Sequence, residues 1–165
     1  MLNRSIPALF LLLVACGSPT PRPTPTPTPT STAADVCHQN GVTYCAVNPT
    51  VTQDTIGKTI CVRGWTRTIR PPVTFTDALK RQQMQQEGLT GLPSAYEEDH
   101  RLALELGGAA RDVTNLSPEL GASPNPKDRD EDAFRQLVCS HQVGLVAAQV
   151  QFIARWLAPY PGYQQ

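Results

Sequence analysis

Apolar residues near the C-terminal end of the chain recur at the spacing of amphipathic helices, in two separate runs. The first run predicts a helix from Asp128 to about His141, and Gly144 breaks the pattern. The apolar face of this helix comprises Phe134, Leu137, Val138 and His141. The second run, which Pro159 ends, has its apolar face at Val146, Val150, Ile153 and Leu157. We expect both faces to pack in the core.

A different pattern occupies the middle of the chain. The segments 59–62 and 65–69 are rich in β-branched and aromatic residues. They predict two strands with a bulge at Gly64, ended by Pro71 and Pro72. Thr76 then predicts the N-cap of a helix that runs from Asp77 to about Glu87 and stops at Gly88.

The N-terminal end has the pattern of an export signal. Residues 1–15 contain Arg4 and an apolar run from Ala8 to Val14, which is too short to span a bilayer. Cys16 follows Leu13-Val14-Ala15, which resembles a bacterial lipobox. We therefore predict lipidation at Cys16 and a membrane-anchored protein that faces the extracytoplasmic space. The alternatives are an ordinary cleaved signal and a buried cysteine at this position.

Residues 16–35 form the next part of the chain, in which proline and threonine alternate from Pro19 to Thr32. Proline fixes φ and removes a backbone donor, so this segment predicts an extended spacer that packs no core. The remaining residues, 36–165, amount to one domain.

Charge is unevenly distributed although the formal net charge is zero. Residues 58–81 hold six basic residues and one acidic residue, a net charge of +5. Residues 97–132 hold ten acidic and four basic residues, a net charge of −6. The first segment could bind phosphate and the second a cation. The alternative is that the two segments pair with each other or face water.

Four cysteines remain when Cys16 is set aside. An even number in an exported domain predicts disulfides, and three pairings are possible. We favour Cys37–Cys45, which closes a short loop, together with Cys61–Cys139, which links distant segments. A zinc site is the alternative, but the chain has no Cys-x-x-Cys spacing.

The chemistry is concentrated in one block. Glu97-Glu98-Asp99-His100 is followed by Leu104-Glu105-Leu106-Gly107-Gly108, then by Asn115-Leu116, and later by Lys127-Asp128 and Glu131. This ordered set resembles the HNH, or ββα-metal, endonucleases, and most of all a branch of small exported bacterial domains. The resemblance covers roughly residues 48–156. It implies an α+β fold with a ββα-metal core, additional helices and a disulfide.

The resemblance also implies functions for single residues. His100 matches the general base, since an imidazole can take a proton near neutral pH. Asp99 matches a metal ligand. Adjacent strand residues point to opposite faces, so we expect the strand to end or bulge at this pair. Asn115 matches the asparagine that bridges backbone groups across the hairpin, and Gly107 and Gly108 allow a tight turn.

The third motif position has several candidate residues, because no histidine lies between Asn115 and Asp132. The candidates for a second metal ligand are Asn125, Asp128 and Glu131, of which we favour Asp128. The alternative is that these residues cap a helix. Three basic residues are candidate phosphate contacts: Arg67, Arg70 and Lys127.

The resemblance thus implies metal-dependent hydrolysis of nucleic acid with little sequence specificity, with DNA favoured over RNA. The hard oxygen ligands indicate Mg²⁺ or Mn²⁺, and Zn²⁺ is a further possibility. The alternative is an inactive, surface-tethered binding or structural domain. Its support is the missing third histidine, Arg101 where the family has an aliphatic residue, and Ser117 where an aromatic residue is common.

Overall fold

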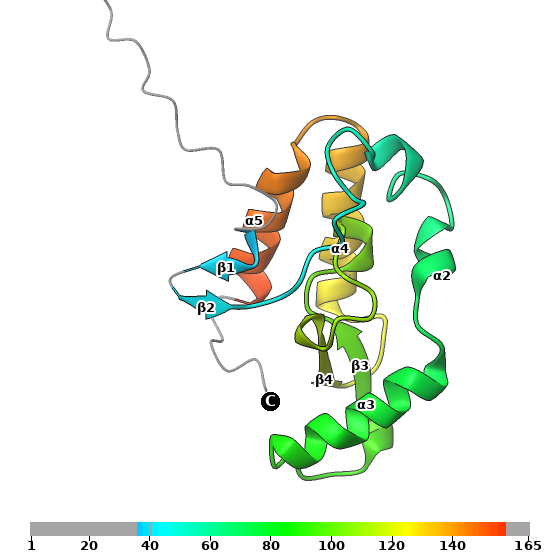
Figure 1. Ribbon diagram of the computed structural model, residues 1–165, viewed down its shortest axis with the longest axis vertical. Helices are drawn as coiled ribbons and strands as arrows, with labels where there is room; N and C mark the ends of the chain where they lie inside the picture. Colours follow the sequence, from blue (N-terminus) through cyan, green and yellow to red (C-terminus); the bar gives the residue numbers. More distant parts are fainter. Residues whose placement is uncertain (1–35, 40, 158–165) are drawn as a thin grey trace, which may run out of the picture. The chain divides into compact units, whose positions relative to one another are not determined.

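The computed structural model describes residues 36–39 and 41–157 (Figure 1). The predicted signal peptide, the lipidation site at Cys16 and the Pro/Thr-rich spacer lie outside the described residues. Within those residues, no helix combines the length and the apolar character needed to cross a bilayer.

Helices and two small antiparallel sheets make up the described residues, which confirms the α+β class. One sheet pairs β1 (His38–Gln39) with β2 (Val42–Thr43), and the other pairs β3 (Tyr96–His100) with β4 (Leu116–Leu120). The helices are α2 (Trp65–Ile69), α3 (Val73–Gln86), α4 (Pro126–Cys139) and α5 (Leu145–Trp156). Short 3-10 helices are η1 (Ile56–Lys58), η2 (Pro93–Ala95), η3 (Leu104–Leu106) and η4 (Val113–Asn115).

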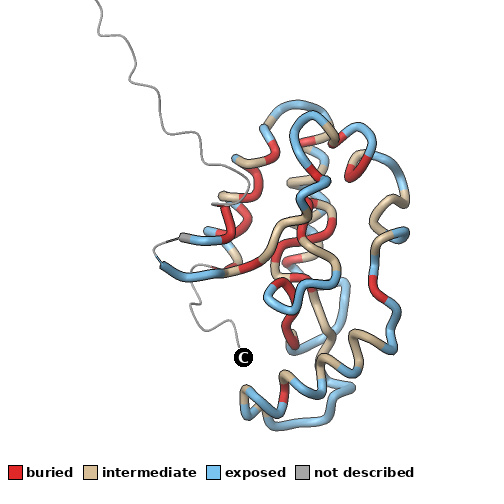
Figure 2. The backbone as a smooth tube through the Cα atoms, viewed as in Figure 1, coloured by how far each residue is buried: buried red, intermediate tan, exposed pale blue. Residues whose placement is uncertain are grey.

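Helices α4 and α5 lie side by side, and α5 contributes buried residues to both apolar clusters of the core, while α3 lies against the β3–β4 hairpin (Figures 1 and 2). One apolar cluster gathers the end of α5 with the segment after β3: Val36, Cys37, Cys45, Leu102, Ala103, Leu106, Phe152, Ile153 and Leu157. The other joins the start of α5 to α4 and η1: Val51, Ile56, Ile60, Val138, Leu145 and Ala148. Phe134 packs against both clusters.

The predicted C-terminal helices are confirmed, with α4 shifted by two residues. Asn125 is its N-cap and accepts hydrogen bonds from the backbone N–H groups of Lys127 and Asp128, at 2.7 and 3.1 Å. The inclusion of His141 on the helix face was wrong, since α4 ends at Cys139 and His141 has a φ of +58°. Gly144 breaks the pattern as predicted and is the N-cap of α5.

The two strands predicted for 59–62 and 65–69 were wrong. The first segment is a series of turns, and the second is helix α2, which begins after Gly64 at a φ of +82°. β-Branched residues favour a strand only where a neighbouring strand pairs with it. Here the carbonyl of Ile60 accepts a hydrogen bond from Arg135 Nε at 2.7 Å, so a helix side chain takes the place of a sheet partner.

The predicted start of α3 was wrong by four residues. The helix begins at Val73 after the N-cap Pro72, and Thr76 lies inside it and donates its hydroxyl to the Val73 carbonyl at 3.1 Å. Proline pre-sets the φ of a helix start, so Pro72 replaced the threonine cap. Gly88, with a φ of +65°, follows the helix end as predicted.

Both favoured disulfides are confirmed, and the zinc alternative for these cysteines is overturned. Cys37 and Cys45 are bonded across a separation of 8 residues, and Cys61 and Cys139 across 78 residues. The second bond joins the turns before α2 to the last residue of α4.

Loss of the longer cross-link is expected to destabilise the domain more. In the chain-entropy treatment, removing Cys61–Cys139 lowers the free energy of unfolding by about 4.5 kcal/mol, and removing Cys37–Cys45 lowers it by about 2.5 kcal/mol. Urea titration of the two double-alanine variants measures both values. Equal losses would contradict this account.

Candidate functional site

The strand β3 delivers Asp99 and His100 to one end of the hairpin. His100 is the last residue of β3, and its register partner on β4 is Leu116. The pairing from Tyr96 to His100 is continuous, so no bulge brings the two side chains together. Both nevertheless line one cavity of about 270 Å³, because the strand ends there. Of the two expected arrangements, a strand end or a bulge, the structure therefore has the strand end.

His100 is buried, with 4% of its surface exposed, and its Nε2 lies 3.0 Å from the Ala110 carbonyl oxygen. A carbonyl only accepts, so Nε2 carries the proton and Nδ1 holds the free lone pair. Burial lowers the pKa of His100 below its ordinary value, against the opposing effects of the Ala110 carbonyl and the Asp99 carboxylate. The imidazole is therefore neutral near pH 7, the form that accepts a proton.

Asn115 holds the segment that follows His100. Its Oδ1 accepts a hydrogen bond from the Leu102 N–H at 2.9 Å, and its Nδ2 donates to the carbonyls of Leu102 and Ala109, each at 3.0 Å. Its side chain is fully buried. Ala109 directly precedes Ala110, whose carbonyl contacts the His100 ring. The Asn115 amide therefore joins Leu102 at the start of this loop to Ala109 beside the imidazole.

Gly107 and Gly108 allow that loop to close. Gly107 has a φ of +85°, in the left-handed region. A Cβ on Gly108 would lie 1.8 Å from the Leu102 carbonyl oxygen and 2.7 Å from Asn115 Nδ2. Glycine at this position is therefore a steric requirement of the hydrogen bonds that Asn115 makes.

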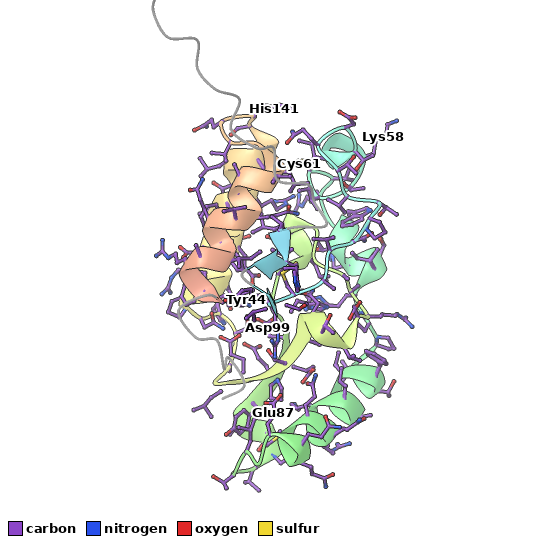
Figure 3. The ribbon with its side chains drawn as sticks, turned by 60° about the vertical axis from the view of Figure 1, so that its left-hand side comes forward. Tyr44, Lys58, Cys61, Glu87, Asp99 and His141 are labelled. Atoms are coloured by element: carbon purple, nitrogen blue, oxygen red, sulfur yellow. A yellow bond between two sulfur atoms is a disulfide. The ribbon has the colours of Figure 1, made fainter. Side chains whose placement is uncertain are left out.

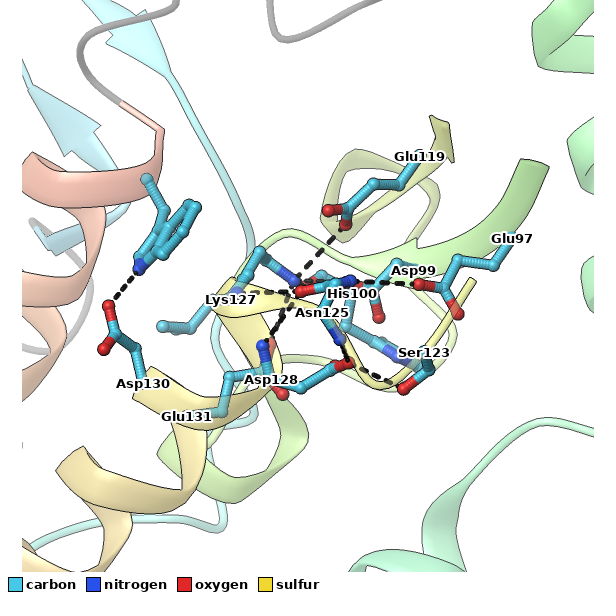
Figure 4. Close-up of polar contacts among 12 residues, drawn as sticks. Glu97, Asp99, His100, Glu119, Ser123, Asn125, Lys127, Asp128, Asp130 and Glu131 are labelled. Atoms are coloured by element: carbon cyan, nitrogen blue, oxygen red, sulfur yellow. Dashed lines mark hydrogen bonds and ion pairs between the residues drawn. The ribbon is translucent and has the colours of Figure 1, made fainter. Parts of the chain in front are cut away.

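Lys127 lies among the carboxylates of the hairpin and α4 (Figure 4). Its Nζ donates to Asp99 Oδ2, to the His100 carbonyl at 3.1 Å and to Glu131 Oε1 at 2.9 Å. Glu119 Oε2 lies 3.8 Å away. Burial favours the neutral amine, but Asp99 and Glu131 outweigh it and raise the pKa of Lys127. The same ammonium overcomes the effect of burial on Asp99 and lowers the pKa of that carboxyl.

Asp128 serves the start of α4. Its Oδ2 accepts hydrogen bonds from the Asn125 N–H and from Ser123 Oγ, both at 2.7 Å. Together with the Asn125 side chain this forms a capping box, which satisfies backbone donors at the helix start. The carboxylate also lines the cavity beside His100.

The predicted metal ligands do not fit a divalent cation as they stand. Asp99 is paired with the Lys127 ammonium, and one oxygen of Asp128 already accepts two hydrogen bonds. Among the residues that the structure describes, no group of three or more His, Cys, Asp or Glu side chains could hold a metal ion. The metal requirement stays a prediction.

The predicted phosphate contacts lie in three different surroundings. Arg70, at the C-terminal end of α2, is exposed and lines the cavity with Asp99 and His100. Arg67 is exposed on α2 but does not line the cavity. Lys127 is 1% exposed and is engaged with carboxylates. Arg70 is thus the basic residue that the structure places beside the imidazole.

Two polar side chains on this cavity lie outside the residues that the sequence indicated. Ser123 and Asp132 line it, next to Glu105 of the motif block and Glu131, one of the candidate metal ligands. Burial raises the pKa of Glu105, and the Asp132 carboxylate raises it further. Asp132 lies four residues after Asp128 on the same helix. Residues i and i+4 share a helix face, so this spacing could have indicated Asp132.

Glu98 lies next to α3 and neither of its carboxyl oxygens has a hydrogen-bond partner among the described residues. Burial raises its pKa from 4.5 to about 8, against the opposing charge of Lys80. The folded protein therefore keeps a proton that the unfolded chain releases above pH 4.5, so this group's contribution to stability falls as the pH rises toward 8.

Glu98→Gln should remove that pH dependence. We expect the variant to gain on the order of 1–2 kcal/mol over the wild type between pH 4.5 and 8, after allowing for solvent screening of a half-buried group. Urea unfolding at several pH values measures the difference, with Asp54→Asn as the control at an exposed carboxyl. Parallel pH profiles for wild type and Glu98→Gln would refute this assignment.

Comparison with known proteins gives no relative: no protein-family model, no curated protein and no solved structure matches the chain.

Proposed function

We propose that the protein hydrolyses phosphodiester bonds of nucleic acid, with His100 as the general base. The observation that carries this proposal is a neutral, buried imidazole at a strand end, on a cavity that it shares with the exposed Arg70. The β3–β4 hairpin followed by α4 would be the ββα core that the family resemblance implies.

The chemistry needs few groups. Nδ1 of His100 takes a proton from a water molecule, whose oxygen bonds to phosphorus as the bond to the leaving oxygen breaks. The leaving oxygen takes a proton from solvent. Arg70 holds a phosphate oxygen, for which a guanidinium offers two parallel donors. Phosphate contacts carry no sequence information, so little sequence specificity is expected.

The proposed location is the extracytoplasmic side of a membrane, with the domain tethered through Cys16. Two disulfides within the described residues support an oxidising compartment. The spacer before residue 36 would hold the domain away from the bilayer.

A plasmid-nicking assay tests the proposal. Purified protein is incubated with supercoiled plasmid, linear duplex, single-stranded DNA and RNA, each with Mg²⁺, Mn²⁺, Zn²⁺ or EDTA. Cleavage that His100→Ala abolishes supports hydrolysis at this site. Absence of cleavage on every substrate and in every buffer would refute it.

The second candidate is a non-catalytic binding or structural domain. The observation in its favour is that Asp99 is already neutralised by Lys127, as expected of a structural ion pair. Intact substrate in every buffer, together with unchanged nucleic-acid binding by His100→Ala, would favour this candidate.

Arg70→Ala provides a further prediction. Loss of one phosphate contact should weaken nucleic-acid binding equally for all sequences and reduce the slope of log K against log salt by about 0.7 to 0.9. Binding isotherms between low and moderate salt measure that slope. Arg63→Ala, which removes an exposed arginine outside the cavity, is the control. An unchanged slope for Arg70→Ala would show that Arg70 does not contact a phosphate of the substrate.

A further inference from the structure

Lys127 has an unusual position for a lysine at the start of a helix. It is the second residue of α4, directly after Pro126, and only 1% of its surface is exposed. Lysine is almost never fully buried unless it is paired. The position therefore requires partners that compensate the cost of removing the ammonium from water.

The partners match the ammonium in number and chemistry. An ammonium has three N–H donors, and the structure supplies three acceptors: Asp99 Oδ2, the His100 carbonyl and Glu131 Oε1. A fourth oxygen, from Glu119, adds charge at 3.8 Å. The oxygens come from β3, β4 and α4, so the ammonium ties both strands of the hairpin to the helix.

Carboxylate and carbonyl oxygens of this kind are also the ligands that Mg²⁺ and Mn²⁺ select. We propose that the Lys127 ammonium takes the place of the divalent cation at Asp99, so that the site is assembled without a metal. An ion that bound Asp99 in the same position would have to expel Lys127, which is buried and would lose its partners.

The charges of the hairpin explain why a cation is needed there. Glu97 and Glu119 lie directly opposite each other in the β3–β4 register, and like charges in that position repel. Asn125 Nδ2 donates to Glu97 Oε1 at 3.2 Å, and Lys127 faces Glu119. The first turn of α4 thus neutralises the acidic face of the hairpin by hydrogen bonding and charge.

Lys127 is also a positioning residue for His100, and this part of the inference rests on the proposed function. Its Nζ donates to the backbone carbonyl of His100 and to the side chain of Asp99, so it fixes the last two residues of β3. Lys127 does not line the cavity and would not touch the substrate.

The wild-type protein gives the first test. We titrate it with Mn²⁺ and follow the paramagnetic broadening of the His100 ring signals. Half-saturation should need more than about 1 mM Mn²⁺, which is the weak limit of dedicated Ca²⁺ sites in proteins. Tight, stoichiometric Mn²⁺ binding that broadens His100 would overturn the proposal. This measurement needs neither a variant nor enzymatic activity.

Lys127→Met gives the second test, since it leaves Asp99, Glu119 and Glu131 without their cation. We expect Mn²⁺ to bind this variant at least tenfold more tightly than the wild type and to raise its melting temperature. Lys58→Met, at an exposed lysine of η1, should leave Mn²⁺ affinity unchanged. Equal Mn²⁺ affinity for Lys127→Met and the wild type would contradict the proposal.

The cleavage assay separates the two proposals. Cleavage that persists in EDTA supports both of them. Cleavage that EDTA abolishes and Mn²⁺ restores keeps the proposed function and overturns the substitution of the metal by Lys127. A protein that binds no Mn²⁺ in the wild type, gains the site in Lys127→Met and cleaves nothing refutes the function but supports the assignment of Lys127.

Discussion

Replacing His100 by alanine is expected to lower the rate of phosphodiester cleavage by roughly 10²- to 10⁴-fold, the usual contribution of a positioned general base. Among the described residues, His100 is the only histidine that lines the cavity. Its Nε2 donates a hydrogen bond to the Ala110 carbonyl, which leaves Nδ1 as the atom that can accept a proton. The substrate affinity should change little, because the proposed phosphate contact is Arg70 and not the imidazole.

His141→Asn is the matched control. His141 follows the C-terminal end of α4, whereas Asp99 lies near the start of that helix, and His141 is exposed (Figure 3). Asparagine tolerates its positive φ. Both variants are purified alongside the wild type and assayed on the same single- and double-stranded substrates, with circular dichroism as the check on folding. Equal cleavage by His100→Ala and the wild type would show that the activity is a contaminant or lies elsewhere.

Elements whose signals lie within a few residues could be predicted from the sequence. Apolar spacing located α4 and α5, and Gly88 and Gly144 marked helix boundaries. The even number of cysteines and the choice of one short and one long loop gave both disulfides. The ordered acidic motif placed Asp99 and His100 at a strand end, because that chemistry needs two adjacent side chains at one cavity.

Segments that depend on distant contacts could not be predicted in the same way. The β-branched residues around Ile60 and Thr66 favour a strand by propensity, but no strand of the described residues pairs with them. Ile60 instead enters the core, and the adjacent Cys61 is bonded to α4. The disulfide and the buried side chain of Ile60 determine the backbone conformation of this segment, and tertiary contacts often override strand propensity in this way.

The environment of Lys127 shows the same limit within the site. A lysine after an N-terminal proline normally faces solvent, so the sequence favoured a phosphate contact. Its burial depends on Asp99 and Glu119, which are 28 and 8 residues away in the chain and meet it only after β3 pairs with β4. No local pattern contains that information, although the excess of acidic residues between 97 and 132 indicated that a cation would be needed.

Replacing Asn115 by alanine should cost about 3 to 5 kcal/mol of unfolding free energy, since each buried polar group left without a partner costs about 1 to 3 kcal/mol. The backbone N–H and carbonyl of Leu102, which is fully buried, and the carbonyl of the half-buried Ala109 would lose their partners. Alanine also leaves an empty volume beside Gly108.

The same substitution should reduce the cleavage rate, because the loop that Asn115 closes carries the Ala110 carbonyl and thereby the orientation of the His100 ring. Urea titration measures the stability, and single-turnover cleavage below the unfolding transition measures the rate. Asn48→Ala is the control: its Oδ1 accepts only from Thr50 in the adjoining turn, so its loss should cost about 1 kcal/mol. Similar losses for Asn48→Ala and Asn115→Ala would show that the amide of Asn115 does not hold the loop, and an unchanged rate in Asn115→Ala would show that His100 is oriented by other contacts.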